Sequence, residues 1–377
     1  MPMKRFVTQG RTSRRSFLGG ALAISCAPCI AKAQENSTPP PDPDCPRCGG
    51  VGRIPLLDAK PFVWMKGTPR PKADAAIGEQ SCPLCQRAAK ADLLAAEVND
   101  WIDAALEKNK QWEERTGWKL ACLVTRHATV HTQLTPDKAR PVGMALESLA
   151  LHLKRLTGSL ALTSTRPDTF ELMLLWEKAA WEQFRKVMEG LYTLEQLGPS
   201  WISARLYNAY DHFATPHTYE TPQSVRIRPP SCGAVFIVGR RQLSRATDWH
   251  TPFWLAEGFA AYCDNAVHKV NRWYTVYDVK QVPVGDWLAD ARKLAAESKL
   301  RTWKEMMKRE LHDWEPADHV QTMATAAFLL ESEPAKFLDL AKRLKSGDQQ
   351  VAALEDAYRT QLDELEQRCT RWLLARR

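Results

Sequence analysis

The sequence predicts an α+β protein, in which a helix-rich domain with a small mixed sheet follows a small four-cysteine module. Two short apolar runs near residues 120–132 and 170–176 have the length and composition of strands. Helical periodicity dominates the chain after residue 250, and two C-P-x-C pairs precede all of these segments. With 377 residues, the chain is long enough for more than one domain.

Residues 1–33 are predicted to be a twin-arginine signal peptide. Arg14 and Arg15 stand in the string S-R-R-S-F-L-G, a stretch of small apolar residues follows, and Ala33 completes an A-x-A cleavage signature. A lipobox ending at Cys26 is a weaker alternative. The signal peptide predicts export to the periplasm or beyond. The apolar stretch is short and no other segment is apolar enough to cross a bilayer, so we expect no transmembrane span in the mature chain.

The formal net charge of +8 owes much to this predicted signal peptide. Its basic residues are Lys4, Arg5, Arg11, Arg14, Arg15 and Lys32. Without them the chain is nearly balanced, so the charge does not indicate a nucleic-acid partner.

Residues 34–44 form a proline-rich linker, and residues 45–88 form the predicted cysteine module. Its four cysteines are Cys45, Cys48, Cys82 and Cys85. Two C-x-x-C turns together offer four thiolates, which predicts one structural zinc ion per chain in a closed tetrahedral site. The glycines after the first pair let backbone N–H groups turn toward the sulfurs. Two disulfides remain open as an alternative, and a redox-active pair would require a thioredoxin-like βαβ setting that the sequence lacks.

The first cysteine pair, C-P-R-C-G-G-V-G, resembles the C-x-x-C-x-G-x-G repeats of DnaJ-type chaperones. The second pair lacks the trailing glycines, so the resemblance implies one zinc site and not the two of the chaperones.

The following elements are expected in chain order. They are a connecting helix over 89–116, a strand pair or one bent strand over 120–132, a helix over 136–157, a strand over 170–176, a helix over 178–188, a helix over 254–267 and helices over most of 289–377. The segment 199–230 carries weak signals and is predicted to be irregular.

The string P-F-W-L-A-E-G-F-A-A-Y at residues 252–262 resembles the second zinc-ligand helix of gluzincin-type metallopeptidases, P-x-W-L-x-E-G-x-A-x-Y. The resemblance covers residues 117–377 diffusely and implies a gluzincin-like α+β domain. It also implies that Glu257 occupies the position of the third metal ligand. In that family an upstream H-E-x-x-H helix supplies two histidine ligands and the general base.

The upstream helix should fall within residues 230–244, P-S-C-G-A-V-F-I-V-G-R-R-Q-L-S, which contain neither histidine nor an acid. In either plausible register, residues such as Ile237, Val238, Arg241 and Gln242 hold the positions of the ligands and the base. Arginine cannot ligate zinc, and valine cannot act as a general base. We therefore expect Glu257 to be a relic ligand position whose carboxylate pairs with Arg240 or Arg241.

Other histidines are not expected to replace the missing ligands. His127 and His131 should share one face of a strand but lie too far apart for a compact site, and His250 should lie in a loop or cap. His212 and His217 fall in the irregular segment. Each is expected to be structural or on the surface.

The sequence thus predicts an exported zinc-binding protein whose metallopeptidase-like domain is not catalytic and binds or scaffolds polypeptide or cell-envelope material. Two alternatives stay open. One is a zinc metallopeptidase with unconventional ligands, and the other is a redox or chaperone-like protein that uses its C-P-x-C pairs.

Overall fold

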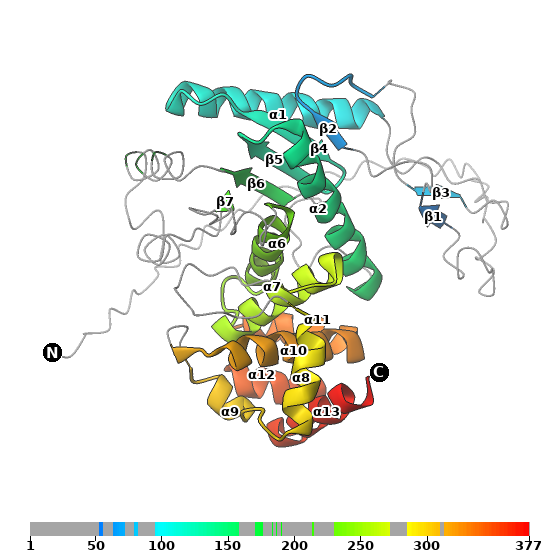
Figure 1. Ribbon diagram of the computed structural model, residues 1–377, viewed down its shortest axis with the longest axis vertical. Coiled ribbons are helices and arrows are strands. Elements are labelled where there is room, and N and C mark those ends of the chain that lie inside the picture. The colour runs from blue at the N-terminus through cyan, green and yellow to red at the C-terminus, as the bar shows by residue number, and fades with distance from the viewer. Residues whose placement is uncertain are drawn as a thin grey trace, which may run out of the picture. The chain divides into compact units, whose positions relative to one another are not determined.

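The protein is an α+β molecule, as predicted, with many helices and one small mixed sheet (Figure 1). The computed structural model describes residues 53–55, 63–71, 79–81, 95–157, 170–175, 183, 186, 190, 213–214, 230–271, 285–309 and 313–376. The predicted signal peptide, the linker and the four cysteines of the C-P-x-C pairs lie outside these residues, as do His212 and His217.

The strands form two sheets. They are β1 (Arg53–Pro55), β2 (Val63–Met65), β3 (Glu79–Ser81), β4 (Ala121–Thr125), β5 (Ala128–Thr132), β6 (Phe170–Leu174) and β7 (Phe213–Ala214). The larger sheet has the order β2-β4-β5-β6-β7, with antiparallel pairing from β2 to β5 and parallel pairing from β5 to β7. The expected strand pair over residues 120–132 is confirmed. Strands β1 and β3 pair antiparallel with each other.

The helices agree with the expected order. They are α1 (Ala95–Thr116), α2 (Pro136–Thr157), α6 (Pro230–Ala246), α7 (Phe253–His268), α8 (Trp287–Ala296), α9 (Trp303–Met306), α10 (Pro316–Ser332), α11 (Pro334–Lys345), α12 (Gln350–Tyr358) and α13 (Leu362–Ala375). Of the helix expected over 178–188, the described residues 183 and 186 are helical. Among the described residues, no helix has the length and apolarity needed to cross a membrane.

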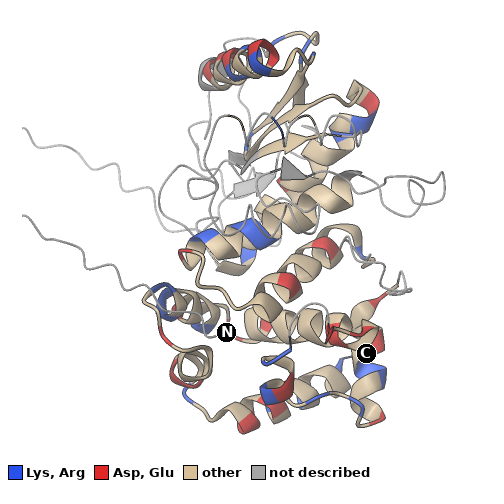
Figure 2. Ribbon diagram, turned by 90° about the vertical axis from the view of Figure 1, so that its left-hand side faces the viewer, with Lys and Arg blue, Asp and Glu red and all other residues tan. Residues whose placement is uncertain are grey.

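The larger sheet is covered on both faces (Figure 1). Successive side chains of a strand point to opposite faces, and β4 follows this rule. Cys122 and Val124 join the cluster that α1 covers, whereas Leu123 joins the main core beneath α2. Helix α2 approaches closely at Gly143, where a Cβ atom would lie 2.9 Å from the Leu123 side chain. The helix expected as a connection over 89–116 therefore packs on the sheet. It also carries acidic and basic residues side by side (Figure 2).

Helix α7 is one of the two most deeply buried helices of the C-terminal part, together with α10. All eleven residues from Trp254 to Asp264 are buried, because α6 and α10 pack against two sides of the helix. Two glycines permit the close approach. A Cβ atom on Gly239 of α6 would lie 2.8 Å from the Cys263 sulfur, and one on Gly258 of α7 would overlap the Thr322 carbonyl oxygen of α10.

We predict that Gly258→Ala lowers the free energy of unfolding by about 1–3 kcal/mol, because the new methyl group meets backbone atoms that cannot rotate away. Gly233→Ala is the matched control. Gly233 lies in α6, and a Cβ atom there would meet nothing within 4 Å. Because alanine favours the helix more than glycine does, this change should stabilise the protein by about 0.5–1 kcal/mol. Urea unfolding of the two variants measures both effects. Equal stability of the two variants would contradict the close contact between α7 and α10.

Candidate functional site: the buried acids of helix α7

Helices α6 and α7 form an antiparallel hairpin. Helix α6 ends at Ala246, and Asp248 and Trp249 reverse the chain with positive φ values of 51° and 66°. Pro252 precedes the first residue of α7, a position that suits proline because the first N–H groups of a helix have no partner within it. Residues 230–244, where the resemblance to gluzincins implied an upstream helix, are helical and lie against α7.

The first buried acid of α7 is Glu257, with 3% of its side chain exposed. Arg240 of α6 places its Nε atom 3.1 Å from Glu257 Oε1. The expected pairing of Glu257 with an arginine of this window is confirmed for Arg240. The guanidinium carbon of Arg240 also lies 5.7 Å from the centre of the Phe253 ring, so the two side chains form a cation–π contact. A guanidinium cannot ligate a metal, and here it compensates the carboxylate charge.

The second buried acid of α7 is Asp264, which is fully buried. His268 stands one helical turn later and places Nδ1 2.9 Å from Asp264 Oδ1. Cys232 of α6 completes a group of three donor atoms that lie within 4.8 Å of one another. Burial alone would lower the pKa of His268, but its hydrogen bonds with Asp264 and Cys232 outweigh burial and raise the pKa to about 9. This group can hold a metal ion.

A cleft of about 400 Å³ opens at the N-terminal end of α7. Its walls come from the α6–α7 turn, α7, the segment after α9 and the segment before α12. Phe253 lines the cleft and contacts Arg240, so the cleft adjoins the Arg240–Glu257 pair. Trp254 and Gln350 also line the cleft, where Trp254 Nε1 donates a hydrogen bond of 2.9 Å to Gln350 Oε1 and connects α7 to α12.

An aromatic row continues from the cleft toward α10. The Phe253 and Trp314 rings are 5.2 Å apart and meet edge to face, and Trp314 meets His319 at 4.7 Å in the same manner. His319 has 3% of its surface exposed. Burial lowers its pKa to about 2, because the low-polarity surroundings disfavour the imidazolium form.

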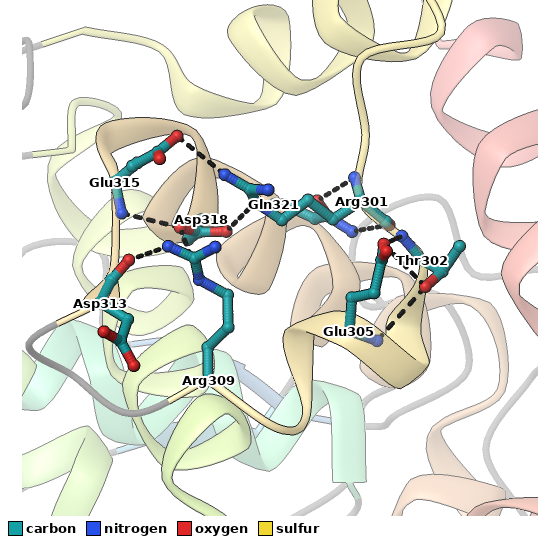
Figure 3. Close-up of polar contacts among 8 residues, drawn as sticks. All are labelled: Arg301, Thr302, Glu305, Arg309, Asp313, Glu315, Asp318 and Gln321. Atoms are coloured by element: carbon teal, nitrogen blue, oxygen red, sulfur yellow. Dashed lines mark hydrogen bonds and ion pairs between the residues drawn. The ribbon is translucent and has the colours of Figure 1, made fainter.

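The cleft residue Arg309 belongs to a polar cluster at the start of α10 (Figure 3). Asp318, 1% exposed, lies 2.9 Å from Arg301 Nε and 3.4 Å from Arg309 Nε. The oxygen that faces Arg309, Oδ2, also accepts a hydrogen bond of 2.7 Å from the Glu315 backbone N–H. Arg309 also donates to the Asp313 carbonyl oxygen. These contacts compensate the buried charge of Asp318, so the cluster fixes Arg309 at the cleft and is structural in character.

Two histidines weighed as substitute ligands have structural partners. The His127 backbone N–H donates to Glu147 of α2, whose second carboxylate oxygen lies 2.7 Å from His127 Nδ1. His131 Nδ1 lies 2.6 Å from Asn109 Oδ1 of α1. The expectation that both share one strand face was wrong, because His127 lies in the turn between β4 and β5 and contacts the helix on the other side of the sheet. His250 lies in the α6–α7 turn, as expected.

Sequence reasoning missed the group formed by Cys232, Asp264 and His268. Asp264 and His268 stand four residues apart in a predicted helix, a spacing that places both side chains on one face. That spacing was a usable signal. Cys232 lies 32 positions before Asp264 in the chain, so its place in the group follows only from the packing of α6 against α7.

No family model, curated protein or solved structure matches this chain.

We predict that Arg240→Met lowers the free energy of unfolding by about 2–4 kcal/mol, because it leaves the Glu257 carboxylate buried beside an apolar chain. Adding Glu257→Gln to this variant should recover at least half of the loss, since the uncompensated charge is then gone. Arg245→Met is the control, an exposed arginine of the same helix, and should cost less than about 1 kcal/mol. If Glu257→Gln rescues nothing, the charge pair is not what stabilises this part of the hairpin.

The neutral His319 predicts an acid-dependent loss of stability. Its folded pKa of about 2 lies below the ordinary value of 6.5, so its contribution is fully present above about pH 6.5 and declines as the pH falls toward 2. The loss amounts to about 1.4 kcal/mol per pH unit within that window. Comparing urea unfolding at pH 7 and pH 5 should show a smaller decline for His319→Gln than for the wild type. The exposed-site variant His250→Gln should decline like the wild type, and equal declines in all three proteins would refute the assignment.

Proposed function

We propose that this chain is an exported zinc-binding protein whose metallopeptidase-like domain binds polypeptide and does not hydrolyse it. The observation that carries the proposal is the Arg240–Glu257 pair. The resemblance of residues 252–262 to gluzincin helices assigns Glu257 to a metal-ligand position. A guanidinium 3.1 Å from that carboxylate supplies the positive charge that a metal would supply and repels a divalent cation.

The same hairpin contains no hydrolytic machinery near Glu257. Metal-assisted hydrolysis requires about three protein ligands, an open position for water and a base within hydrogen-bond reach of that water. The described helix α6 offers neither a carboxylate nor a histidine along its whole length. The cleft that adjoins Glu257 is therefore proposed to retain binding without chemistry.

The cleft has the composition of a polypeptide-binding surface. Its volume of about 400 Å³ is in the range of ligand sites, which run from about 300 to 1,000 Å³. Phe253 and Met307 are partly exposed apolar side chains, and Arg309 and Asp348 provide charges of both signs. Such a mixture can accept a side chain and the polar backbone of an extended peptide.

The zinc ion is proposed to lie in the four-cysteine module. Strands β1 and β3 pair antiparallel, with Arg53 opposite Ser81. Arg53 follows Cys48 by five positions, and Ser81 directly precedes Cys82. The described residues next to the two C-P-x-C pairs thus lie side by side at one end of the two-stranded sheet. This arrangement favours one shared site over two separate pairs.

One experiment on the purified mature protein tests binding and catalysis together. A broad peptide library is incubated with the protein, with and without added zinc, and both retained and cleaved peptides are identified by mass spectrometry. We expect a retained subset and no zinc-dependent cleavage. Met307→Asp should reduce retention at least tenfold, because it adds a charge to the apolar part of the cleft. Met144→Asp is the matched control, at an exposed methionine of α2, and should retain peptides like the wild type.

Any of three results would overturn the proposal. Cleavage that disappears in Glu257→Ala would show that the relic position is catalytic, and equal retention by both aspartate variants would remove the cleft as the binding site. Cleavage that instead disappears in Cys232→Ser would favour the second candidate, a metallopeptidase with unconventional ligands. The specific observation for that candidate is the donor group of Cys232, Asp264 and His268.

A further inference from the structure

We propose that Cys232, Asp264 and His268 form a zinc site that is separate from the four-cysteine module and joins α6 to α7. The three donor atoms are a thiol sulfur, a carboxylate oxygen and an imidazole nitrogen, all within 4.8 Å of one another. These are the donor types that zinc prefers in proteins. Ligands of a tetrahedral zinc ion lie about 3–4 Å apart, so the group needs little rearrangement to bind one.

The fold brings the three residues together from two helices. Cys232 lies in the first turn of α6, and Asp264 and His268 lie in the last two turns of the antiparallel α7. The close approach of the helices at Gly239, against Cys263, fixes their separation next to the group. The site is therefore built on two rigid elements, which is the arrangement that holds metal ligands most accurately.

The orientation of His268 suits a metal ligand. Its Nδ1 faces Asp264 at 2.9 Å, and its Nε2 lies 3.3 Å from Ser231 Oγ. Metal-binding histidines ordinarily donate the N–H of the other ring nitrogen to an oxygen acceptor, which holds the ring in place. Ser231 provides that acceptor, so Nδ1 is the nitrogen assigned to the ion.

Charge compensation also favours a divalent ion. Asp264 is fully buried, as is Cys232, and a buried carboxylate is costly unless a cation compensates it. A thiolate and a carboxylate together balance the two charges of a zinc ion, and a neutral imidazole adds a third bond. The ion would thus supply the positive charge that compensates the buried Asp264 carboxylate.

His268 contacts Ser231 through one ring nitrogen and Asp264 through the other, as the histidine of a Ser-His-Asp hydrolytic triad does. The burial of the group argues against that chemistry. Ser231 is 7% exposed and Cys232 is not exposed at all, so neither side chain presents a nucleophile to a bound substrate. His268 has 17% of its side chain exposed. That opening suits an ion and a water molecule better than a peptide.

Metal analysis of the full mature chain tests the site. The wild-type protein, loaded with zinc under reducing conditions and desalted, should contain about two zinc ions per chain. Cys45→Ser should remove the ion of the cysteine module, and His268→Gln should remove the other. His268 is partly exposed in the last turn of α7, so of the three ligand changes this variant should disturb the packing of the hairpin least. Cys369→Ser, at a buried cysteine of α13, is the control and should keep both ions.

A second measurement does not depend on counting ions. In the Cys45→Ser protein, zinc should still raise the melting temperature, and this shift should vanish when His268→Gln is added. In the same Cys45→Ser protein, cobalt in place of zinc should give a thiolate-to-metal absorption band that is lost when Cys232→Ser is added.

The outcomes separate the two zinc proposals. One ion that is lost with Cys45→Ser and kept with His268→Gln refutes the site on α6 and α7 and leaves the cysteine module standing. One ion with the opposite dependence refutes the module and supports this site. Zinc that is retained in both single variants at the wild-type level refutes both.

Discussion

The burial of helix α7 between α6 and α10 is the constraint on which the rest of this structure depends. Eleven consecutive residues of the helix are buried, and the contacts at Gly239 and Gly258 leave no room for a side chain on either side. Such a helix would ordinarily be apolar on all faces. Helix α7 instead carries Glu257 and Asp264 seven positions apart, on the side toward α6, and each buried carboxylate requires a compensating cation.

The charges of the two acids are compensated by different kinds of side chain, and this difference separates a metal-excluding end of the hairpin from an end that can bind a metal ion. Arg240 reaches Glu257 from α6 and contacts the Phe253 ring, so a side chain of the protein itself compensates this charge. At Asp264 the partners are a histidine and a cysteine, both of which can exchange a proton for a metal. The hairpin thus has a permanently compensated end beside the cleft and an end at which an ion can bind.

The sequence predicted the class of the fold and most of its elements because those elements follow local rules. The Thr135-Pro136-Asp137 start of α2 and the paired strands of residues 120–132 needed no tertiary information. The Arg240–Glu257 pair could be anticipated because the resemblance of residues 252–262 to a gluzincin helix implied a partner helix within residues 230–244, where Arg240 and Arg241 stand. The group at Cys232 could not be anticipated, since it depends on the position of α6 along the axis of α7, which the sequence does not specify. The opposite sides taken by His127 and His131 were likewise missed, because the turn that rotates His127 away from the strand leaves no clear signal in the sequence.

We propose that Arg240 supplies at Glu257 the positive charge that a metal ion supplies at the corresponding position of gluzincins. Anomalous X-ray diffraction at the zinc absorption edge, on crystals of the zinc-loaded mature protein, tests it most directly because it locates every bound zinc ion. The account predicts Arg240 at ion-pair distance from Glu257 and no anomalous peak at that carboxylate, even when zinc occupies other sites in the same crystal. A zinc peak bonded to Glu257, with the Arg240 guanidinium displaced, would contradict the account.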